Sequence, residues 1–151
     1  MTKTFLVAID GSDQAWKALD LAIDIARLSD AELAILHVVP YEVFPEGLKE
    51  FAKGEGIQIE EERARFHEGR TLADAITAEA AARAAKHGLQ CVKTHTAEGN
   101  AAKEIIAMAK SKAVDMLFMG SRGLGEVRGL LLGSVSHKVM NMAPCTCVTV
   151  K

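Results

Sequence analysis

Short apolar runs alternate with segments of helical periodicity along the whole chain, and this alternation limits the folds that the chain can adopt. The apolar runs are typical of strands and cover residues 4–9, 32–39, 89–96, 115–119 and 145–150. Between them, apolar residues recur three and four positions apart, as on one face of a helix. Strands that alternate with helices in this way favour a parallel sheet with helices packed on both faces.

The residues at the ends of the helical segments are typical helix boundaries. Ser12 and Asn100 precede apolar residues at helical spacing and are expected N-caps. A long helix is expected over about 62–87, ending at Gly88, and a last helix over about 134–142. Helices are therefore expected between all successive strands.

The composition of the strands predicts their order in the sheet. Residues 4–9 and 115–119 are almost wholly apolar, as strands buried on both faces should be, whereas 89–96 and 145–150 mix in polar residues, as edge strands do. We therefore predict a doubly wound, five-stranded parallel sheet of strand order 3-2-1-4-5. In this order the chain reverses direction between strands one and four, and open sheets bind ligands at the carboxyl ends of strands beside such a reversal.

The composition is that of one ordinary globular domain, which we expect to span residues 1–151. The chain is 49% hydrophobic and 25% charged, with a formal net charge of −2, which argues against nucleic acid as a partner. No apolar stretch is long enough for a membrane span, and the N-terminus does not resemble a signal peptide. Three cysteines without metal-ligand spacing, together with the lack of an export signal, predict a cytoplasmic protein.

Residues 40–61 are longer than an ordinary connection in a compact domain. Such a segment is either a lid over a binding site or a variable surface insertion without chemistry. Within it, the stretch GLKEFAK has the pattern of a short helix. The sequence leaves both interpretations open.

Residues 120–134, GSRGLGEVRGLLLGS, hold five of the chain's twelve glycines and lie between the fourth strand and the last helix. The run lacks the lysine of a Walker A loop, and its glycines have neither the spacing nor the position of the G-x-G-x-x-G dinucleotide fingerprint. A phosphate-receiver domain would need further acidic residues near Asp10. These three kinds of site are therefore excluded.

The two ends of the glycine run offer backbone donors to an anion. Gly120 and Gly123 bracket a tight turn at the end of the strand, while Gly133 and Ser134 open a helix. The first N–H groups of a helix lack helical partners and carry partial positive charge. Two separated groups of donors suit a chain of phosphates. We therefore predict phosphate binding here, and the alternative is a loop whose glycines only form turns.

At these residues the chain resembles a known family, the ATP-binding branch of the universal stress proteins. Gly120-x-x-Gly123, nine further residues and Gly133-Ser134 match its G-2x-G-9x-G-[S/T] signature. The similarity also includes the stretches VAIDGS, LHVV and LLGSVS and the closing apolar strand, and so covers almost the whole chain. It implies a Rossmann-like fold, similar to the adenine nucleotide alpha hydrolases.

The resemblance also implies which residues contact a nucleotide. Asp10 matches an aspartate near the adenosine moiety, and Val38 matches the position whose backbone pairs with the adenine edge. The residues that match ribose and phosphate contacts are Gly120, Gly123, Gly133 and Ser134. The implied ligand is ATP, or another adenine nucleotide, with Mg²⁺ on the phosphates.

Neighbouring side chains are candidates for the same site. Arg122 and Arg128 lie in the loop and either neutralise phosphate charge or face solvent. Val135 belongs with the nucleotide-binding residues at the start of the last helix. Ser136, one turn inside that helix, either faces phosphate or is an ordinary helical serine.

Three other residues are expected to be structural. His37 and His137 have no evident carboxylate partner, so we expect each to have a structural or surface role rather than a catalytic one. Trp16 is expected to pack from the first helix against the sheet.

These features predict an ATP-binding regulatory protein of the stress response, which presents its nucleotide-bound state to an unidentified protein partner. The alternative is a slow or partner-dependent ATPase or a phosphate-transferring enzyme. The chain lacks a P-loop lysine, a second acidic metal ligand and a convincing water-positioning base, so we expect at most weak ATP hydrolysis. A structural dimer module with a vestigial pocket is disfavoured by the intact signature.

The last strand, residues 145–150, is expected at an edge of the sheet. Exposed edges invite pairing with another chain. We therefore expect a homodimer built on this strand, and the family resemblance points to the same assembly.

Overall fold

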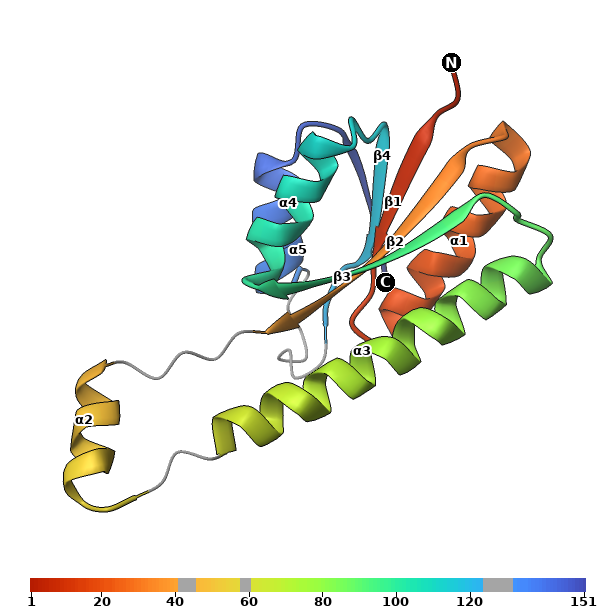
Figure 1. Cartoon of the computed structure of the whole chain (residues 1–151). Coiled ribbons are helices and arrows are strands. Elements are labelled where there is room, and N and C mark those ends of the chain that lie inside the picture. The colour runs from red at the N-terminus through yellow and green to blue at the C-terminus, as the bar shows by residue number, and fades with distance from the viewer. Residues whose placement is uncertain (41–45, 58–60, 124–131) are drawn as a thin grey trace.

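The computed structural model of the chain describes residues 1–40, 46–57, 61–123 and 132–151. Within these ranges, strands and helices alternate as the sequence predicts (Figure 1). In chain order the elements are β1 (Thr4–Ala8), α1 (Asp13–Ser29), β2 (Glu32–Pro40), α2 (Glu46–Gly54), α3 (Glu61–Lys86), β3 (Val92–Gly99), α4 (Ala101–Ser111), β4 (Met116–Gly120), α5 (Ser134–Met142) and β5 (Thr146–Val150). No helix in the described part of the chain is long and apolar enough to cross a membrane.

The strands form one parallel sheet in the order β3-β2-β1-β4-β5, which confirms the predicted order. β1 and β4 pair at its centre, and the three inner residues of each are buried. α1 and α3 cover one face of the sheet, and α4 and α5 cover the other (Figure 1). The carboxyl ends of β1 and β4 therefore lie side by side where the chain direction reverses.

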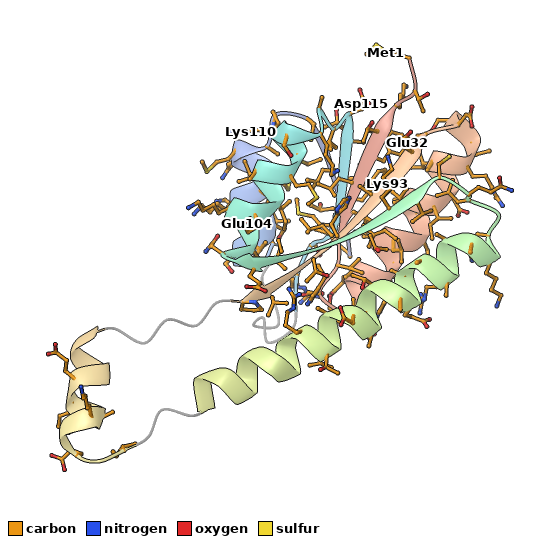
Figure 2. The ribbon with its side chains drawn as sticks, viewed as in Figure 1. Met1, Glu32, Lys93, Glu104, Lys110 and Asp115 are labelled. Carbon is orange, nitrogen blue, oxygen red and sulfur yellow. The ribbon has the colours of Figure 1, made fainter. Side chains whose placement is uncertain are left out.

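Two apolar layers hold the helices against the sheet. Facing α1 and α3, the rings of Phe5 and Phe118 are buried with their centroids 5.7 Å apart. Facing α4 and α5, Leu6 and Leu117 are fully buried. Successive residues of a strand point to opposite faces, so the apolar runs fill both layers. Figure 2 shows the side chains that occupy the space on either side of the sheet.

Hydrogen bonds at the helix ends confirm the predicted N-caps. The Ser12 hydroxyl accepts a hydrogen bond from the Ala15 N–H at 3.3 Å, and the Asn100 side-chain oxygen accepts one from the Lys103 N–H at 3.0 Å. Each bond satisfies an amide that the first turn leaves without a helical partner. α1 and α4 therefore begin where the sequence predicts.

The start of β3 differs from the prediction, because the residues before it complete the end of α3. Gly88 adopts a φ of +80°, and its N–H donates to the Ala85 carbonyl at 3.0 Å. The Leu89 N–H donates to the Ala84 carbonyl, also at 3.0 Å. These bonds form a Schellman motif, in which an apolar residue after the glycine is buried near the last helical turn. β3 therefore begins at Val92 rather than at residue 89.

The long connection after β2 contains the short helix that its sequence predicts. α2 spans Glu46–Gly54 and stands apart from the sheet in Figure 1. Residues 41–45 and 58–60 of the connection lie outside the described residues. Its role as a lid or as a variable insertion stays a prediction.

The three cysteines are free thiols. Cys91 is exposed, whereas Cys145 and Cys147 are partly buried near β5, which begins at Thr146, one residue later than predicted. Burial, with smaller effects from Cys147 and Asp115, raises the pKa of the Cys145 thiol to about 11. The pKa of Cys147 is raised as well, chiefly by burial. Both thiols are therefore protonated near neutral pH and are weak nucleophiles.

Candidate functional site

Asp10 follows the end of β1 with its carboxylate fixed by the next residues of the chain. Its Oδ1 atom accepts hydrogen bonds from the Ser12 N–H at 2.9 Å and from the Ser12 hydroxyl at 2.6 Å. Gly11 between them has a φ of +89°, a conformation that side chains disfavour. Because Ser12 also caps α1, the turn that starts the helix orients the carboxylate at the end of a central strand.

Two glycines let the chain leave β4 in close contact with its neighbours. A Cβ atom on Gly120 would lie 2.9 Å from the Gln14 Cβ and 3.0 Å from the Ala15 backbone nitrogen, at the start of α1. A Cβ atom on Gly123 would lie 2.5 Å from the Asp10 Oδ2 atom. The distances of 2.9 Å and 2.5 Å are shorter than real Cβ contacts. The signature glycines therefore allow the exit of β4 to pass directly over the start of α1 and the Asp10 carboxylate.

Among the described residues, no side chain caps the start of α5, unlike α1 and α4. Its N-cap is Gly133, and its first turn contains no acidic residue. The Gly133 N–H donates to the Ser121 carbonyl at 2.6 Å, so this amide serves the fold. The first intrahelical bond runs from the His137 N–H to the Gly133 carbonyl. Ser134, Val135 and Ser136 supply the other amides of the first turn, and donors for an external anion are expected among them.

Ser121, just after β4, is hydrogen-bonded both to the start of α5 and to the edge strand β5. Its carbonyl also accepts a hydrogen bond from the Ser136 hydroxyl at 2.7 Å, and its N–H donates to the Val150 carbonyl at 2.7 Å. Ser136 is consequently buried. The sequence did not distinguish this serine from an ordinary helical one, because its partner lies fifteen residues earlier in the chain.

These segments line one cavity of about 650 Å³ at the carboxyl ends of β1, β2 and β4. All residues predicted to bind the nucleotide line it except Ser134, which is exposed. The lining residues of that set are Asp10, Val38, Gly120, Arg122, Gly123, Gly133, Val135 and Ser136. The sequence prediction thus brings together residues that share one cavity, and their contacts with a ligand stay a prediction.

The cavity combines polar groups with an apolar wall. The polar groups come from the turn after β1, the exit of β4 and the start of α5. The apolar wall comes from β2, α4 and β4, through Leu36, Val38, Ile105 and Met119. A mostly apolar cavity with a few converging polar groups is the usual form of a small-molecule site.

α3 forms a further wall that the sequence did not predict. Gly69, Leu72 and Ile76 of this helix line the cavity together with Trp16 of α1. A Cβ atom on Gly69 would lie 2.9 Å from the Val39 Cγ1 atom, so the glycine lets α3 pass close to the end of β2. A glycine within a long helix costs helix stability and is a signal that could have pointed to this contact.

Arg122 reaches the cavity from the exit of β4. It is half-buried, and the Gln14 side-chain amide can bond it twice, donating to the Arg122 carbonyl and accepting from its Nη2 atom, each at 3.2 Å. Arg122 lines the cavity, and the choice between a ligand-facing and a solvent-facing guanidinium stays a prediction. Arg128 lies outside the described residues.

The residues predicted to be structural are placed accordingly. His37 is buried, and its Nδ1 atom lies 2.7 Å from the Ile9 carbonyl oxygen. His137 is exposed and contacts Asn141 on the same helix. Trp16 packs against the core, with the guanidinium of Arg83 4.5 Å from its ring centre. Trp16 and His37 nevertheless also line the cavity.

The described residues offer little to a metal ion by themselves. No group of three or more His, Cys, Asp or Glu side chains in this part of the chain is placed to hold one. Asp10 is the carboxylate that these residues supply to the cavity. Mg²⁺ commonly binds through one or two carboxylates, water and substrate phosphates. The described lining therefore fits Mg²⁺ as an ion carried by phosphates.

Comparison with known proteins gives one family over the whole chain. The model of the universal stress protein family matches residues 1–151. Universal stress protein YxiE of Bacillus subtilis is 36% identical over 167 residues, covering 100% of both chains. The fold is similar to universal stress protein UspA from Lactobacillus plantarum, with a TM-score of 0.76, 22% identity and coverage of 99% and 97%. A universal stress protein in complex with cAMP has a TM-score of 0.71, 29% identity and coverage of 99% and 97%.

Proposed function

The chain belongs to the universal stress protein family, and from this premise we propose that it is a stress-response regulator that binds an adenine nucleotide in the cavity. One observation carries the proposal: Asp10, the turn at Gly120–Gly123 and the uncapped start of α5 converge on that cavity. The relative in complex with cAMP supports an adenine nucleotide as the ligand class.

Each part of an adenine nucleotide would meet a suitable surface. The phosphates lie at the start of α5, where backbone amides and the helix dipole favour negative charge. Arg122 adds a positive charge at the same rim, and Asp10 accepts hydrogen bonds from ribose hydroxyls. The adenine ring lies against the apolar wall beside Val38.

ATP with Mg²⁺ on its phosphates is the form that we propose for the bound ligand. The described cavity lining supplies one arginine, Arg122, against the several negative charges of a triphosphate. Mg²⁺ bound to the phosphates would offset part of the remaining charge.

Regulation requires only that the nucleotide-bound and empty states differ in a way that a partner protein can recognise. The second candidate is a slow or partner-dependent ATPase. Asp10, the carboxylate of the described lining, already accepts two hydrogen bonds from Ser12 through Oδ1. The described lining places no second carboxylate beside it to position water or a metal ion, and we therefore favour binding over catalysis.

Mass spectrometry of the nucleotide that copurifies with the protein tests the ligand class. We expect an adenine nucleotide, and a rise in Tm when ATP is added, because a ligand that binds the folded state stabilises it. Protein that carries no nucleotide and keeps the same Tm with ATP would refute the proposal. Turnover of about 1 per second or faster would instead identify an enzyme.

Gly133→Val tests the proposed site through a change that should weaken ATP binding but leave the fold intact. Residue 133 has a φ of −74° and a ψ of 167°, which valine adopts without strain, so the substitution adds bulk at the start of α5. We expect ATP affinity to fall at least about tenfold while the Tm of the empty protein stays near that of the wild type. Gly54→Val, at a position where a Cβ meets no atom within 4 Å, is the matched control. Unchanged ATP affinity in Gly133→Val would overturn the site assignment.

We further propose a cytoplasmic homodimer paired through residues 145–150, and a separate regulatory protein as partner. β5 lies at an edge of the sheet, which supports pairing through this strand.

A further inference from the structure

β1 stops pairing with β2 before β2 ends. The last pair in register is Ala8 with Leu36, and the last hydrogen bond between the two segments runs from the Ile9 N–H to the Leu36 carbonyl at 2.9 Å. β2 continues to Pro40. Because alternate residues of a strand face the same neighbour, Val38 is the next residue of β2 to face the line of β1. Val38 also lines the cavity.

The His37 side chain bonds the Ile9 carbonyl where the next backbone hydrogen bond of the β1–β2 ladder would otherwise form. In a ladder one step longer, the Val38 N–H would donate to the Ile9 carbonyl, and the Val38 carbonyl would accept from the Gly11 N–H. Neither bond is present between these described residues. The Ile9 carbonyl is instead 2.7 Å from the Nδ1 atom of the buried His37 ring. A carbonyl oxygen only accepts, so Nδ1 carries the proton.

We propose that His37 is a positioning residue for recognition of the base. By bonding the Ile9 carbonyl, its ring ends the β1–β2 ladder before Val38. The Val38 N–H and C=O then face the cavity as an adjacent donor and acceptor. Adenine presents the complementary pair, because its N1 atom accepts and its N6 amino group donates. The inference rests on the proposed function, since it names how the base of that nucleotide is recognised.

Removal of the ring donor should extend the β1–β2 hydrogen-bond ladder by one step. The Ile9 carbonyl would lose its partner at a largely buried position, and an unpaired buried carbonyl is costly. In register, the nearest donor able to replace Nδ1 is the Val38 N–H. Pairing of Ile9 with Val38 would then occupy the amide that the base requires.

Three variants test this role. His37→Leu removes the donor, whereas His37→Asn keeps an N–H near the position of Nδ1 and should restore most of the binding lost in His37→Leu. His95→Leu is the matched control, because His95 lies on the neighbouring strand, opposite Leu36, and does not line the cavity. We expect AMP affinity to fall about tenfold in His37→Leu and to be unchanged in His95→Leu.

Comparison of AMP with purine riboside 5′-phosphate, which lacks the amino group, gives a readout that loss of stability would not produce. The wild type should prefer AMP by about fivefold to tenfold, and His37→Leu should bind the two ligands almost equally. Hydrogen exchange gives a second readout. The Val38 amide should be protected in the wild type only when AMP is bound, but already in empty His37→Leu.

The results distinguish this inference from the proposed function. If the wild type binds neither AMP nor ATP, the proposed function fails. If the wild type binds AMP and His37→Leu keeps both the affinity and the preference for AMP over purine riboside 5′-phosphate, only the role of His37 is overturned. Rapid exchange of the Val38 amide in empty His37→Leu would also overturn it.

Discussion

Among single residues, the glycines of the signature have different physical tasks. Gly120 and Gly123 are required for space, since a Cβ would meet Gln14 in one case and the Asp10 carboxylate in the other. Gly133 has ordinary backbone angles and instead leaves the start of α5 uncapped. The sequence predicts that these glycines matter together. Their separate tasks depend on α1 and β1, which the sheet brings against the loop.

Gly123→Ala should impair the site through one added methyl group. Its Cβ would lie 2.5 Å from the Asp10 Oδ2 atom, so the carboxylate or the loop has to move. We expect ATP affinity to fall about tenfold or more, with a loss of about 1–3 kcal/mol in the free energy of unfolding. Isothermal titration and urea unfolding measure the two effects.

Gly54→Ala is the control for that substitution, because a Cβ at residue 54 meets nothing within 4 Å. It should leave ATP affinity unchanged and slightly increase stability, since alanine is a better helix former than glycine. Equal behaviour of the two variants would mean that close approach at Gly123 is not needed for binding.

At the level of elements, the helices were easier to predict from sequence than the strand ends. Ser12 and Asn100 mark helix starts by their own hydrogen bonds, which depend only on neighbouring residues. Leu89 is apolar and looks like the start of a strand, but it is buried as part of the end of α3. Whether such a residue belongs to a helix cap or to a strand is decided by the packing of both elements, which local pattern does not contain.

Gly88→Ala should destabilise the fold without changing the affinity for the nucleotide. The φ of +80° at this position is unfavourable for alanine, so we expect the free energy of unfolding to fall by about 1–2 kcal/mol. Gly88→Asn should lose less, because asparagine tolerates the left-handed region better. Urea unfolding with an unchanged m-value measures the difference. Equal stability of both variants and the wild type would contradict a required Schellman motif.

For the whole molecule, strand order and the position of the cavity followed from sequence because both depend on which strands are apolar throughout. Burial on both faces places β1 and β4 at the centre, and the reversal between them fixes the crevice. The wall formed by α3 could not be predicted in the same way. It arises from the contact of Gly69 with Val39, across a connection whose path the sequence does not specify.

Assembly through β5 can be tested with two neighbouring prolines. The Ser121 N–H donates to the Val150 carbonyl. The backbone N–H and C=O groups of Val150 and Val148 therefore face β4, while those of Thr149 face the open edge of the sheet. Thr149→Pro removes only an outward donor and should convert the proposed dimer to a folded monomer. Val148→Pro removes a bond within the sheet and should lower the Tm.

Light scattering at micromolar concentration measures the oligomeric state of each protein. A monomeric wild type would refute the proposed dimer. A Thr149→Pro variant that is folded and still dimeric would show that the two copies meet elsewhere.

The indole of Trp16 has a practical consequence for measurements on this molecule. It is the chain's single tryptophan, and it lies on the wall of the cavity with Arg83 against its ring. Tryptophan emission from the unmodified protein therefore arises from one place, beside the proposed ligand. The molecule carries its own optical probe of occupancy, and titrations need neither a label nor an engineered fluorophore.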